Sequence, residues 1–298
     1  AKEQAVKDAI LKSVDHLKKK NFGAIEEEVR NAFSVNRNVD LGTDYFTDVK
    51  ERWERLNNAA IVPKFRTPFE SINEALEGGL AHKEMAMVVA PPGVGKSLFL
   101  ANQAARSVLD GHNVLYISLE MAEDRVAQRL DSIFTRIQQK ELANRVDDIE
   151  ERLDTISKQW EERGRLVIKE FPCKRLSVTG LRAYLNQLKN YEDFTPDVIV
   201  MDYLELMKTE KDMAEYAGQE RLAQELRGCA SEYECLVWTA TQTNREGKKV
   251  SIITDSELAD SYGKIRVCDL VFSINQTEQE FDEGLARLYL MKSRNGRA

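Results

Sequence analysis

The sequence contains few of the residues that bind metals or form disulfides, with three histidines and four cysteines among 298 residues. The cysteines stand singly, without the spacing of a metal site, so we expect reduced cytosolic thiols packed mostly as small core residues. So few histidines disfavour a histidine-based metal or acid–base site. The longest apolar runs are the size of one strand, and residues 1–8 lack the apolar core of a signal peptide. We therefore expect a cytoplasmic protein with no membrane partner.

Positive charge is not in excess either, since 43 Lys and Arg residues stand against 50 Asp and Glu residues and give a net charge of −7. This balance argues against a uniformly basic surface for nucleic acid. It permits a local basic channel, because attraction to phosphate depends on the charges near the strand. The length and the hydrophobic content of 42% fit one large or two modest globular domains.

The most informative motif is Ala-Pro-Pro-Gly-Val-Gly-Lys-Ser at residues 90–97. An apolar run at 85–89 precedes it and a helix-like run at 98–105 follows, which is the strand–loop–helix context of a P-loop. Lys96 would reach the β- and γ-phosphates of ATP, and Ser97 would place its hydroxyl on Mg²⁺. The expected nucleotide-binding residues of this loop are Pro92, Gly93, Val94, Gly95, Lys96 and Ser97. The competing interpretation is a glycine-containing turn of another α/β protein, and the first position is Ala where the pattern has Gly.

From Pro63 onward, strand-like and helix-like segments alternate. Strands are predicted at 85–90, 113–118, 165–169, 197–202, 235–240, 270–274 and 286–291. Helices are predicted at 97–110, 122–137, 143–163, 177–190 and 217–233. Strands joined by helical crossovers form a mainly parallel sheet covered by helices, so we expect an α/β fold for residues 63–298. The strand at 113–118 directly follows the P-loop helix, and we expect it to lie beside the P-loop strand.

Residues 1–62 have a helical pattern instead. Apolar residues recur at three- and four-residue steps within 3–34, and Phe46, Val49 and Trp53 share one face of a helix predicted near 45–56. These helices carry too little apolar surface for a core of their own. We interpret residues 1–62 as a helical linker or interaction arm, and the alternative is an ordinary N-terminal extension.

Two carboxylates are placed to complete a site for phosphoryl transfer. The apolar strand at 197–202 ends in Asp202, as a Walker B strand does, which makes Asp202 the preferred metal-coordinating partner of the P-loop. Glu120 follows the strand at 113–118, where its carboxylate would face the γ-phosphate and orient the attacking water. Taken alone, Asp202 could end any buried strand, and Glu120 could be an acidic residue at the start of a helix.

The segment Ser118-Leu119-Glu120-Met121 resembles the Ser-Leu-Glu-Met motif of DnaB-type replicative helicases, which are RecA-fold motors that form hexameric rings. Other segments within residues 65–298 resemble further motifs of that family in the same order. They are Glu77-Gly78-Gly79-Leu80, Asp202-Tyr203-Leu204-Glu205-Leu206-Met207, Ala240-Thr241-Gln242-Thr243-Asn244-Arg245 and Lys292-Ser293-Arg294-Asn295-Gly296. The spacing of 114–118 from the P-loop, and the acid-rich segment after it, resemble the phage members more than the bacterial ones.

For ATP hydrolysis, the resemblance implies that Glu120 polarises water and that Gln242 senses the γ-phosphate and couples it to DNA. Asp202 would join Ser97 in holding Mg²⁺. Arg129 falls where the family has an arginine of the nucleotide site; the competing interpretation is a surface charge on a helix. The cofactors implied are therefore ATP and Mg²⁺.

The resemblance also implies contacts with a neighbouring subunit and with DNA. Lys292 and Arg294 would be fingers that act on the neighbour's ATP. The family's DNA-binding loops correspond here to 208–218 and 245–266. The expected DNA-binding residues are Arg245, Ala259, Asp260, Ser261, Tyr262, Gly263 and Lys264. Such loops grip phosphates without sequence preference, and the arginine that bacterial members have near Ala259 is missing here.

The function implied is an ATP-dependent replicative helicase that translocates along single-stranded DNA as a homohexameric ring. Its further partners would be a primase and a helicase loader, and a phage-encoded protein would act in the cytoplasm of its bacterial host. The alternative is a RecA-like recombination or regulatory ATPase that binds DNA without processive unwinding. A closed ring favours the helicase and an open filament favours the alternative, although both use head-to-tail interfaces.

Overall fold

The computed structural model describes residues 12–14, 16, 43–61, 64–160, 162–209, 215–243, 252–254 and 262–294. The chain divides into two compact units, residues 1–63 and residues 64–298, and each is described by itself.

In the first unit, residues 43–61 form helix α3 (Val49–Ile61) and the turn before it. The Asp44 carboxylate accepts the backbone N–H groups of Phe46 and Thr47, at 3.1 and 3.2 Å. Because an aspartate that bonds its own following backbone favours a turn, α3 begins four residues later than the pattern predicts. Residues 12–14 and 16 are helical, and the rest of the helical pattern within 3–34 lies outside the described residues.

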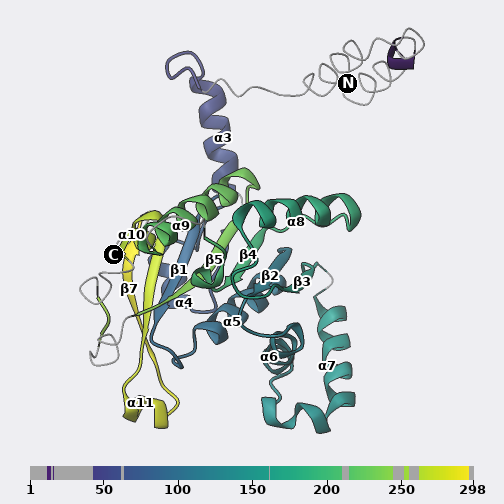
Figure 1. The fold of residues 1–298 in the computed structure, drawn as a ribbon, viewed down its shortest axis with the longest axis vertical. Coiled ribbons are helices and arrows are strands. Elements are labelled where there is room, and N and C mark those ends of the chain that lie inside the picture. The colour runs from purple at the N-terminus through teal and green to yellow at the C-terminus, as the bar shows by residue number, and fades with distance from the viewer. Residues whose placement is uncertain are drawn as a thin grey trace. The chain divides into compact units, whose positions relative to one another are not determined.

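The second unit is built on a seven-stranded sheet with the order β3-β2-β4-β5-β1-β6-β7 (Figure 1). All pairs are parallel except β6 with β7, which form an antiparallel hairpin. The strands are β1 (Met85–Ala90), β2 (Val114–Ser118), β3 (Leu166–Glu170), β4 (Val198–Asp202), β5 (Leu236–Gln242), β6 (Leu270–Asn275) and β7 (Arg287–Ser293). Every predicted strand is present within one or two residues of its expected bounds.

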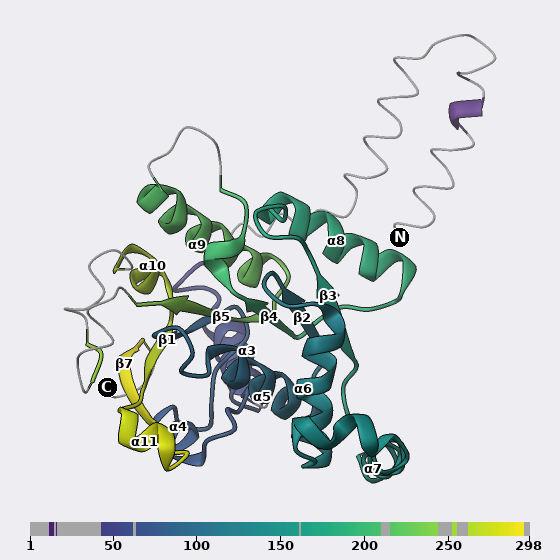
Figure 2. The same ribbon diagram turned by 60° about the horizontal axis from the view of Figure 1, so that its bottom comes forward.

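Helices cover both faces of this sheet, as Figures 1 and 2 show from two directions. One face carries α8 (Val178–Tyr191), α9 (Glu215–Glu232) and α10 (Tyr262–Val267). The other carries α4 (Glu70–Ala75), α5 (Lys96–Leu109) and α6 (Glu123–Thr135). The mainly parallel sheet covered by helices is the fold expected from the sequence.

Alternate residues of the buried strands pack into two cores. From β1, Met85, Met87 and Val89 face α8 and α9, while Ala86 and Val88 face α5. All six residues of β1 are buried, because a parallel strand covered on both faces has no solvent side. The P-loop therefore starts from a strand that is buried along its whole length.

The expectation that 113–118 lies beside the P-loop strand is wrong. Two strands, β4 and β5, separate β2 from β1. The connection from β1 through α5 passes over β5 and β4 before it reaches β2. The local sequence does not indicate how many strands a crossover passes over. Glu120 still reaches the P-loop, because the carboxyl ends of all parallel strands meet at one edge of the sheet.

Short helices and one long helix also depart from the expected pattern. The elements α4, α10 and α11 (Glu278–Asp282) are not predicted, because five or six residues are too few for a clear helical period. The helix predicted at 143–163 is instead a 3₁₀ helix, η1 (Gln139–Asn144), followed by α7 (Val146–Gln159). No residue of α7 is buried, so this helix is a surface element.

Candidate nucleotide-binding site

The loop between β1 and α5 has the backbone shape of an anion-binding turn. Gly93 and Gly95 adopt φ of +87° and +98°, a region in which side chains with a Cβ are strained. No atom lies within 4 Å of where a Cβ would sit on either residue, so conformation rather than space selects glycine here. Helix α5 begins at Lys96, so its N-terminal N–H groups, which have no partner inside the helix, face the loop.

Lys96 lies beneath this loop, where its Nζ donates to the carbonyl oxygens of Ala90 and Pro91, each at 3.2 Å. Burial lowers the pKa of Lys96 below its usual value, and the nearby carboxylates of Glu205, Glu120 and Asp202 oppose that shift. A cation so enclosed by carbonyls and carboxylates is placed to bind phosphate oxygens at the mouth of the loop.

Asp202 connects the end of β4 to the start of α5. Its Oδ1 accepts the Ser97 hydroxyl at 3.1 Å, and its Oδ2 accepts the Tyr116 hydroxyl at 2.9 Å. The side chain is fully buried, and this burial raises the pKa of Asp202 even though the two hydroxyls act in the opposite direction. The Ser97–Asp202 pair expected from the sequence is thus formed.

This pair fits the ligand preference of Mg²⁺. The metal prefers oxygen ligands and takes one or two carboxylates together with substrate phosphates, instead of a complete protein cage. Among the described residues, no group of three or more His, Cys, Asp or Glu residues is placed to hold a metal. One buried carboxylate and one hydroxyl beside a phosphate-binding loop suit a metal that arrives with a nucleotide.

A cleft of about 610 Å³ opens above the P-loop. Three residues expected from the sequence line it together with the loop: Glu120, Arg129 and Gln242. They come from the end of β2, the middle of α6 and the end of β5. Met121 and Gln139 also line the cleft and were not predicted, since no motif marks the short helix η1 that carries Gln139.

Gln242 is held at the rim of this cleft by the residue that follows Asp202. Its Nε2 donates to the Tyr203 hydroxyl at 2.9 Å. Burial raises the pKa of Tyr203 to about 12, with the neighbouring carboxylates Glu120 and Glu205 acting in the same direction. Tyr203 therefore stays a neutral hydroxyl that can accept from Gln242 at any physiological pH.

Val94 lies apart from the other loop residues. It lines a second cavity of about 460 Å³, which shares Pro92 and Gly93 with the cleft and extends toward the β6–β7 hairpin. Ile253 and Phe281 form its apolar wall, while Asn275 contributes an amide. The P-loop is thus open on both sides.

Lys264 belongs to a buried polar cluster at the carboxyl edge of the sheet. Its Nζ donates to Glu205 Oε1 at 2.7 Å and to Thr241 Oγ1 at 3.0 Å. Thr241 precedes Gln242, and its hydroxyl also bonds Glu205. Lys264 is 5% exposed, so in this structure its ammonium is directed into the protein. Of the other expected DNA-binding residues, Tyr262 and Gly263 start α10, while Arg245, Ala259, Asp260 and Ser261 lie outside the described residues.

Lys292 and Arg294 lie at the opposite end of the sheet from the P-loop. The register pairs Leu270 with Ser293 across β6 and β7, and pairs the same Leu270 with Ala86 near the start of β1. The P-loop begins after Ala90, four residues further along β1, which is about 13 Å at 3.3 Å per residue. Arg294 therefore cannot reach the P-loop of the same chain without leaving this position.

No helix among the described residues is both long enough and apolar enough to cross a membrane.

The parallel sheet, the P-loop and the carboxylates at the strand ends define a nucleotide-binding protein with a RecA-like α/β fold. The family model for the DnaB-like helicase C-terminal domain matches residues 65–298, and the chain belongs to that family.

Individual relatives agree with this assignment. The DnaB-like replicative helicase of Enterobacteria phage T4 is 31% identical over 291 residues, covering 93% of this chain and 59% of that protein. Among solved structures, the ATPase domain of another protein matches with a TM-score of 0.69 at 16% identity, covering 86% of this chain and 93% of that one. A DnaB-like replicative helicase studied for its interactions with primase matches with a TM-score of 0.68, also at 16% identity, covering 99% and 72%. The chain spans 55–62% of the length of three curated relatives that it matches.

Proposed function

We propose that this chain is the motor of a replicative DNA helicase, which hydrolyses ATP and translocates along single-stranded DNA as a homohexameric ring. The observation that carries the proposal is the meeting of the P-loop, Glu120, Arg129 and Gln242 around one cleft. Family membership supports it, because the matched relatives include proteins named as replicative helicases.

ATP would enter the cleft with its phosphates on the loop. The N–H groups at the start of α5 and the Lys96 ammonium would bind the phosphate oxygens, and Ser97 and Asp202 would hold Mg²⁺. When bound, Mg²⁺ neutralises charge on the β- and γ-phosphates. Arg129 lines the same cleft and adds a permanent positive charge beside the nucleotide.

Hydrolysis would use the Glu120 carboxylate as the group that orients water and takes its proton. The water oxygen forms a bond to the γ-phosphorus, and the bond from that phosphorus to the β–γ bridging oxygen breaks, giving ADP and phosphate. Gln242 would sense whether the γ-phosphate is present. Because Gln242 bonds Tyr203, a movement of Gln242 at the γ-phosphate would be transmitted to Tyr203, which follows β4.

Arg294 would complete the site of the neighbouring subunit. Its place at the opposite end of the sheet suits a head-to-tail ring, in which one end of each subunit faces the P-loop of the next. A guanidinium is planar and always charged, and such a finger contributes about 10³- to 10⁵-fold to phosphoryl transfer. Lys292 is proposed as its companion.

DNA binding is proposed for the loops at 208–218 and 245–266, whose phosphate contacts would give no sequence preference. Phosphate contacts predict that affinity for single strands falls steeply between low and moderate salt. A primase and a helicase loader are proposed partners, and the cytoplasm is the proposed location, that of the bacterial host if the protein is phage-encoded.

The deciding experiment is unwinding of a forked duplex with ATP by the full-length protein. Lys96→Ala serves as the inactive control, and native mass spectrometry measures the number of subunits. Strand separation that needs ATP and Lys96, from a six-subunit particle, supports the proposal. ATP hydrolysis and DNA binding without strand separation, from a filament or another assembly, would instead favour a RecA-like ATPase.

A further inference from the structure

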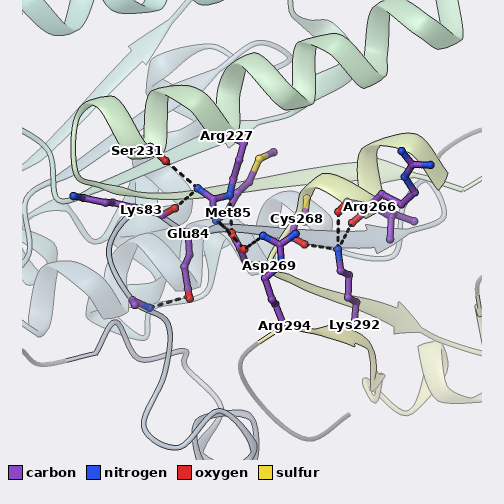
Figure 3. A network of polar contacts seen from close by, with 12 residues as sticks. Lys83, Glu84, Met85, Arg227, Ser231, Arg266, Cys268, Asp269, Lys292 and Arg294 are labelled. Carbon is purple, nitrogen blue, oxygen red and sulfur yellow. Dashed lines mark hydrogen bonds and ion pairs between the residues drawn. The ribbon is translucent and has the colours of Figure 1, made fainter. Parts of the chain in front are cut away.

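A buried carboxylate, Asp269, binds Arg294, the arginine that is proposed above to act on the ATP of the neighbouring subunit. Asp269 precedes β6 and is 4% exposed. Its Oδ1 accepts Arg294 Nη1 at 2.8 Å, and its Oδ2 accepts the backbone N–H of Met85 at 2.9 Å. Arg227 of α9 pairs with Oδ2 through Nε at 2.8 Å. Figure 3 shows Arg227 and Arg294 reaching the carboxylate from different elements.

Backbone hydrogen bonds also hold Asp269 in position. The Arg294 N–H donates to the Asp269 carbonyl at 2.8 Å, and the Asp269 N–H donates to the Met85 carbonyl, also at 2.8 Å. The starts of β1 and β6 and the end of β7 are therefore joined at this one residue. Asp269 is fixed by the sheet and can in turn fix a side chain that reaches the surface.

The charges at this junction do not cancel. One carboxylate faces two guanidinium groups, and the two differ in exposure, because the Arg227 side chain is 24% exposed and that of Arg294 is 51% exposed. Arg227 also donates through Nη1 to the Ser231 hydroxyl and the Lys83 carbonyl, and through Nη2 to Asp269 Oδ1 at 3.3 Å. The surplus positive charge thus lies on the outward side of Arg294, where an anion from another molecule can approach.

Lys292 is used differently, although it stands two residues away. Its Nζ donates to three carbonyl oxygens at the end of α10 and just beyond, those of Ile265, Arg266 and Cys268, at 3.2, 2.7 and 2.7 Å. An ammonium has three donors, so these bonds occupy all of them. In this structure Lys292 fastens β7 to α10 and would have to release these carbonyls to act beside Arg294, which is the exposed cation of this strand end.

We propose that Asp269 is a positioning residue that aims Arg294 at the nucleotide phosphates of the neighbouring subunit, an inference that rests on the proposed function. Asp269 holds Nη1 of the guanidinium, and the Arg294 side chain stays half exposed, so a phosphate from another molecule can reach it. Holding the side chain in place before the neighbour's phosphate arrives removes the cost of ordering it during the reaction.

The test compares Asp269→Asn with Arg294→Ala in DNA-stimulated ATP hydrolysis by the full-length assembly. Asparagine keeps an oxygen for the Met85 N–H but removes the charge that attracts Arg294. We expect kcat to fall about 10- to 100-fold, which is the size of effect that misplacing a catalytic group produces. KM for ATP should change less than about threefold. The double variant should be no slower than Arg294→Ala alone, because residues that act as one unit are not additive.

Glu234→Gln is the matched control. Glu234 forms an ion pair with Lys83 at the same end of the sheet, with Nζ and Oε1 2.6 Å apart, and touches neither arginine. Loss of the Glu234–Lys83 ion pair should leave kcat unchanged. If Asp269→Asn does not assemble, Asp269→Ser, which removes the charge with a smaller side chain, takes its place.

Mixed assemblies separate positioning from a structural role. Asp269→Asn subunits are mixed with Glu120→Gln subunits, and mixing is verified by native mass spectrometry. If Asp269 acts through Arg294 on the neighbour, an Asp269→Asn subunit still hydrolyses ATP beside a Glu120→Gln subunit, whose finger is intact, so activity returns. If Asp269 only supports its own subunit, that ATP site stays damaged and nothing returns, which overturns the proposal.

Failure of the two proposals can be told apart. Normal kcat in Arg294→Ala would remove the finger from the proposed function and the inference about Asp269 with it. A strong defect in Arg294→Ala with normal kcat in Asp269→Asn would overturn the inference and leave the proposed finger in place.

Discussion

Glu120 and Asp202 lie near each other but in different surroundings. The register pairs Ser118 with Asp202, so the two carboxylates follow adjacent strand ends. Asp202 is buried and accepts two hydroxyls, whereas Glu120 is exposed and lines the cleft. Only the exposed carboxylate is open to a water molecule, which supports the proposal that Asp202 holds the metal and that Glu120 orients the attacking water.

We therefore expect Glu120→Gln and Lys96→Ala to fail in different ways. Glu120→Gln should bind ATP with near-normal affinity and lose at least about 100-fold in hydrolysis, because a neutral amide cannot take a proton from water. Lys96→Ala should lose both ATP binding and hydrolysis, since it removes the cation that lies beneath the phosphate-binding loop. Nucleotide binding measured by fluorescence and phosphate release measured in parallel separate the two outcomes.

Glu123→Gln is the matched control for this comparison. Glu123 lies three residues further along, where its carboxylate pairs with Lys169 and accepts the Glu170 N–H. Its replacement should leave hydrolysis within about twofold, as expected for a surface ion pair. Near-normal turnover in Glu120→Gln would contradict its assignment and make Asp202 the next candidate.

The four cysteines should differ sharply in reactivity. Burial raises the pKa of Cys235 and of Cys268 to about 12 and that of Cys229 to about 11, whereas Cys173 is exposed. Thiolate is the reactive form, and at pH 8 only about one in 10³ or fewer of the buried thiols is ionised. We expect iodoacetamide to label only Cys173 in the folded protein, as read by peptide mass spectrometry. Labelling of Cys268 at a similar rate would show that the end of β7 opens.

Among the elements, the turn before β1 is closed by a glycine with no room for a side chain. Phe65 and Leu80 form a two-way backbone bridge, and Gly79 stands beside it with a φ of +130°. A Cβ on Gly79 would lie 2.3 Å from the Phe65 carbonyl oxygen, a contact that real structures do not contain. The turn thus depends on a close approach of two backbone segments.

Gly79→Ala should lower the free energy of unfolding by about 2–5 kcal/mol, the combined cost of a left-handed φ and of overpacking. Gly284→Ala is its control, because Gly284 also has a positive φ, +70°, but no atom within 4 Å of a Cβ. That control should lose only about 1–2 kcal/mol. Urea unfolding midpoints compare the two. Equal losses would mean that the contact with Phe65 relaxes at little cost.

The elements also show what the sequence could and could not predict. The alternation of apolar runs located all seven strands, and a motif located Lys96, Ser97 and Glu120. Each of these signals is contained in a few neighbouring residues. The wrong neighbour expected for β2 and the contacts of Asp269, which were not predicted, have a common cause. Asp269 bonds Met85 across 184 positions of sequence, and no local pattern encodes such a pairing.

For the whole molecule, the two units differ in how their apolar side chains are covered. The second unit has two buried cores, one on each face of its sheet. In the first unit, Phe46 is 85% exposed and Trp53 is 57% exposed, and Val49 is also exposed. Phe46 lies in the turn before α3 and Trp53 lies on α3 itself, and exposed apolar side chains of this kind suit a contact surface for another molecule.

We predict that deleting residues 1–57 weakens assembly more than it weakens folding of the remainder, because residues 64–298 form a compact unit with its own cores. Assembly is measured by analytical ultracentrifugation and folding by thermal unfolding. Phe46→Ser and Trp53→Ser should reproduce the loss of assembly within the full chain. Lys50→Ser, an exposed polar position of the same helix, is the matched control and should assemble normally. A deletion that keeps the assembly size would refute the interaction arm, because the interfaces would then lie wholly within the second unit.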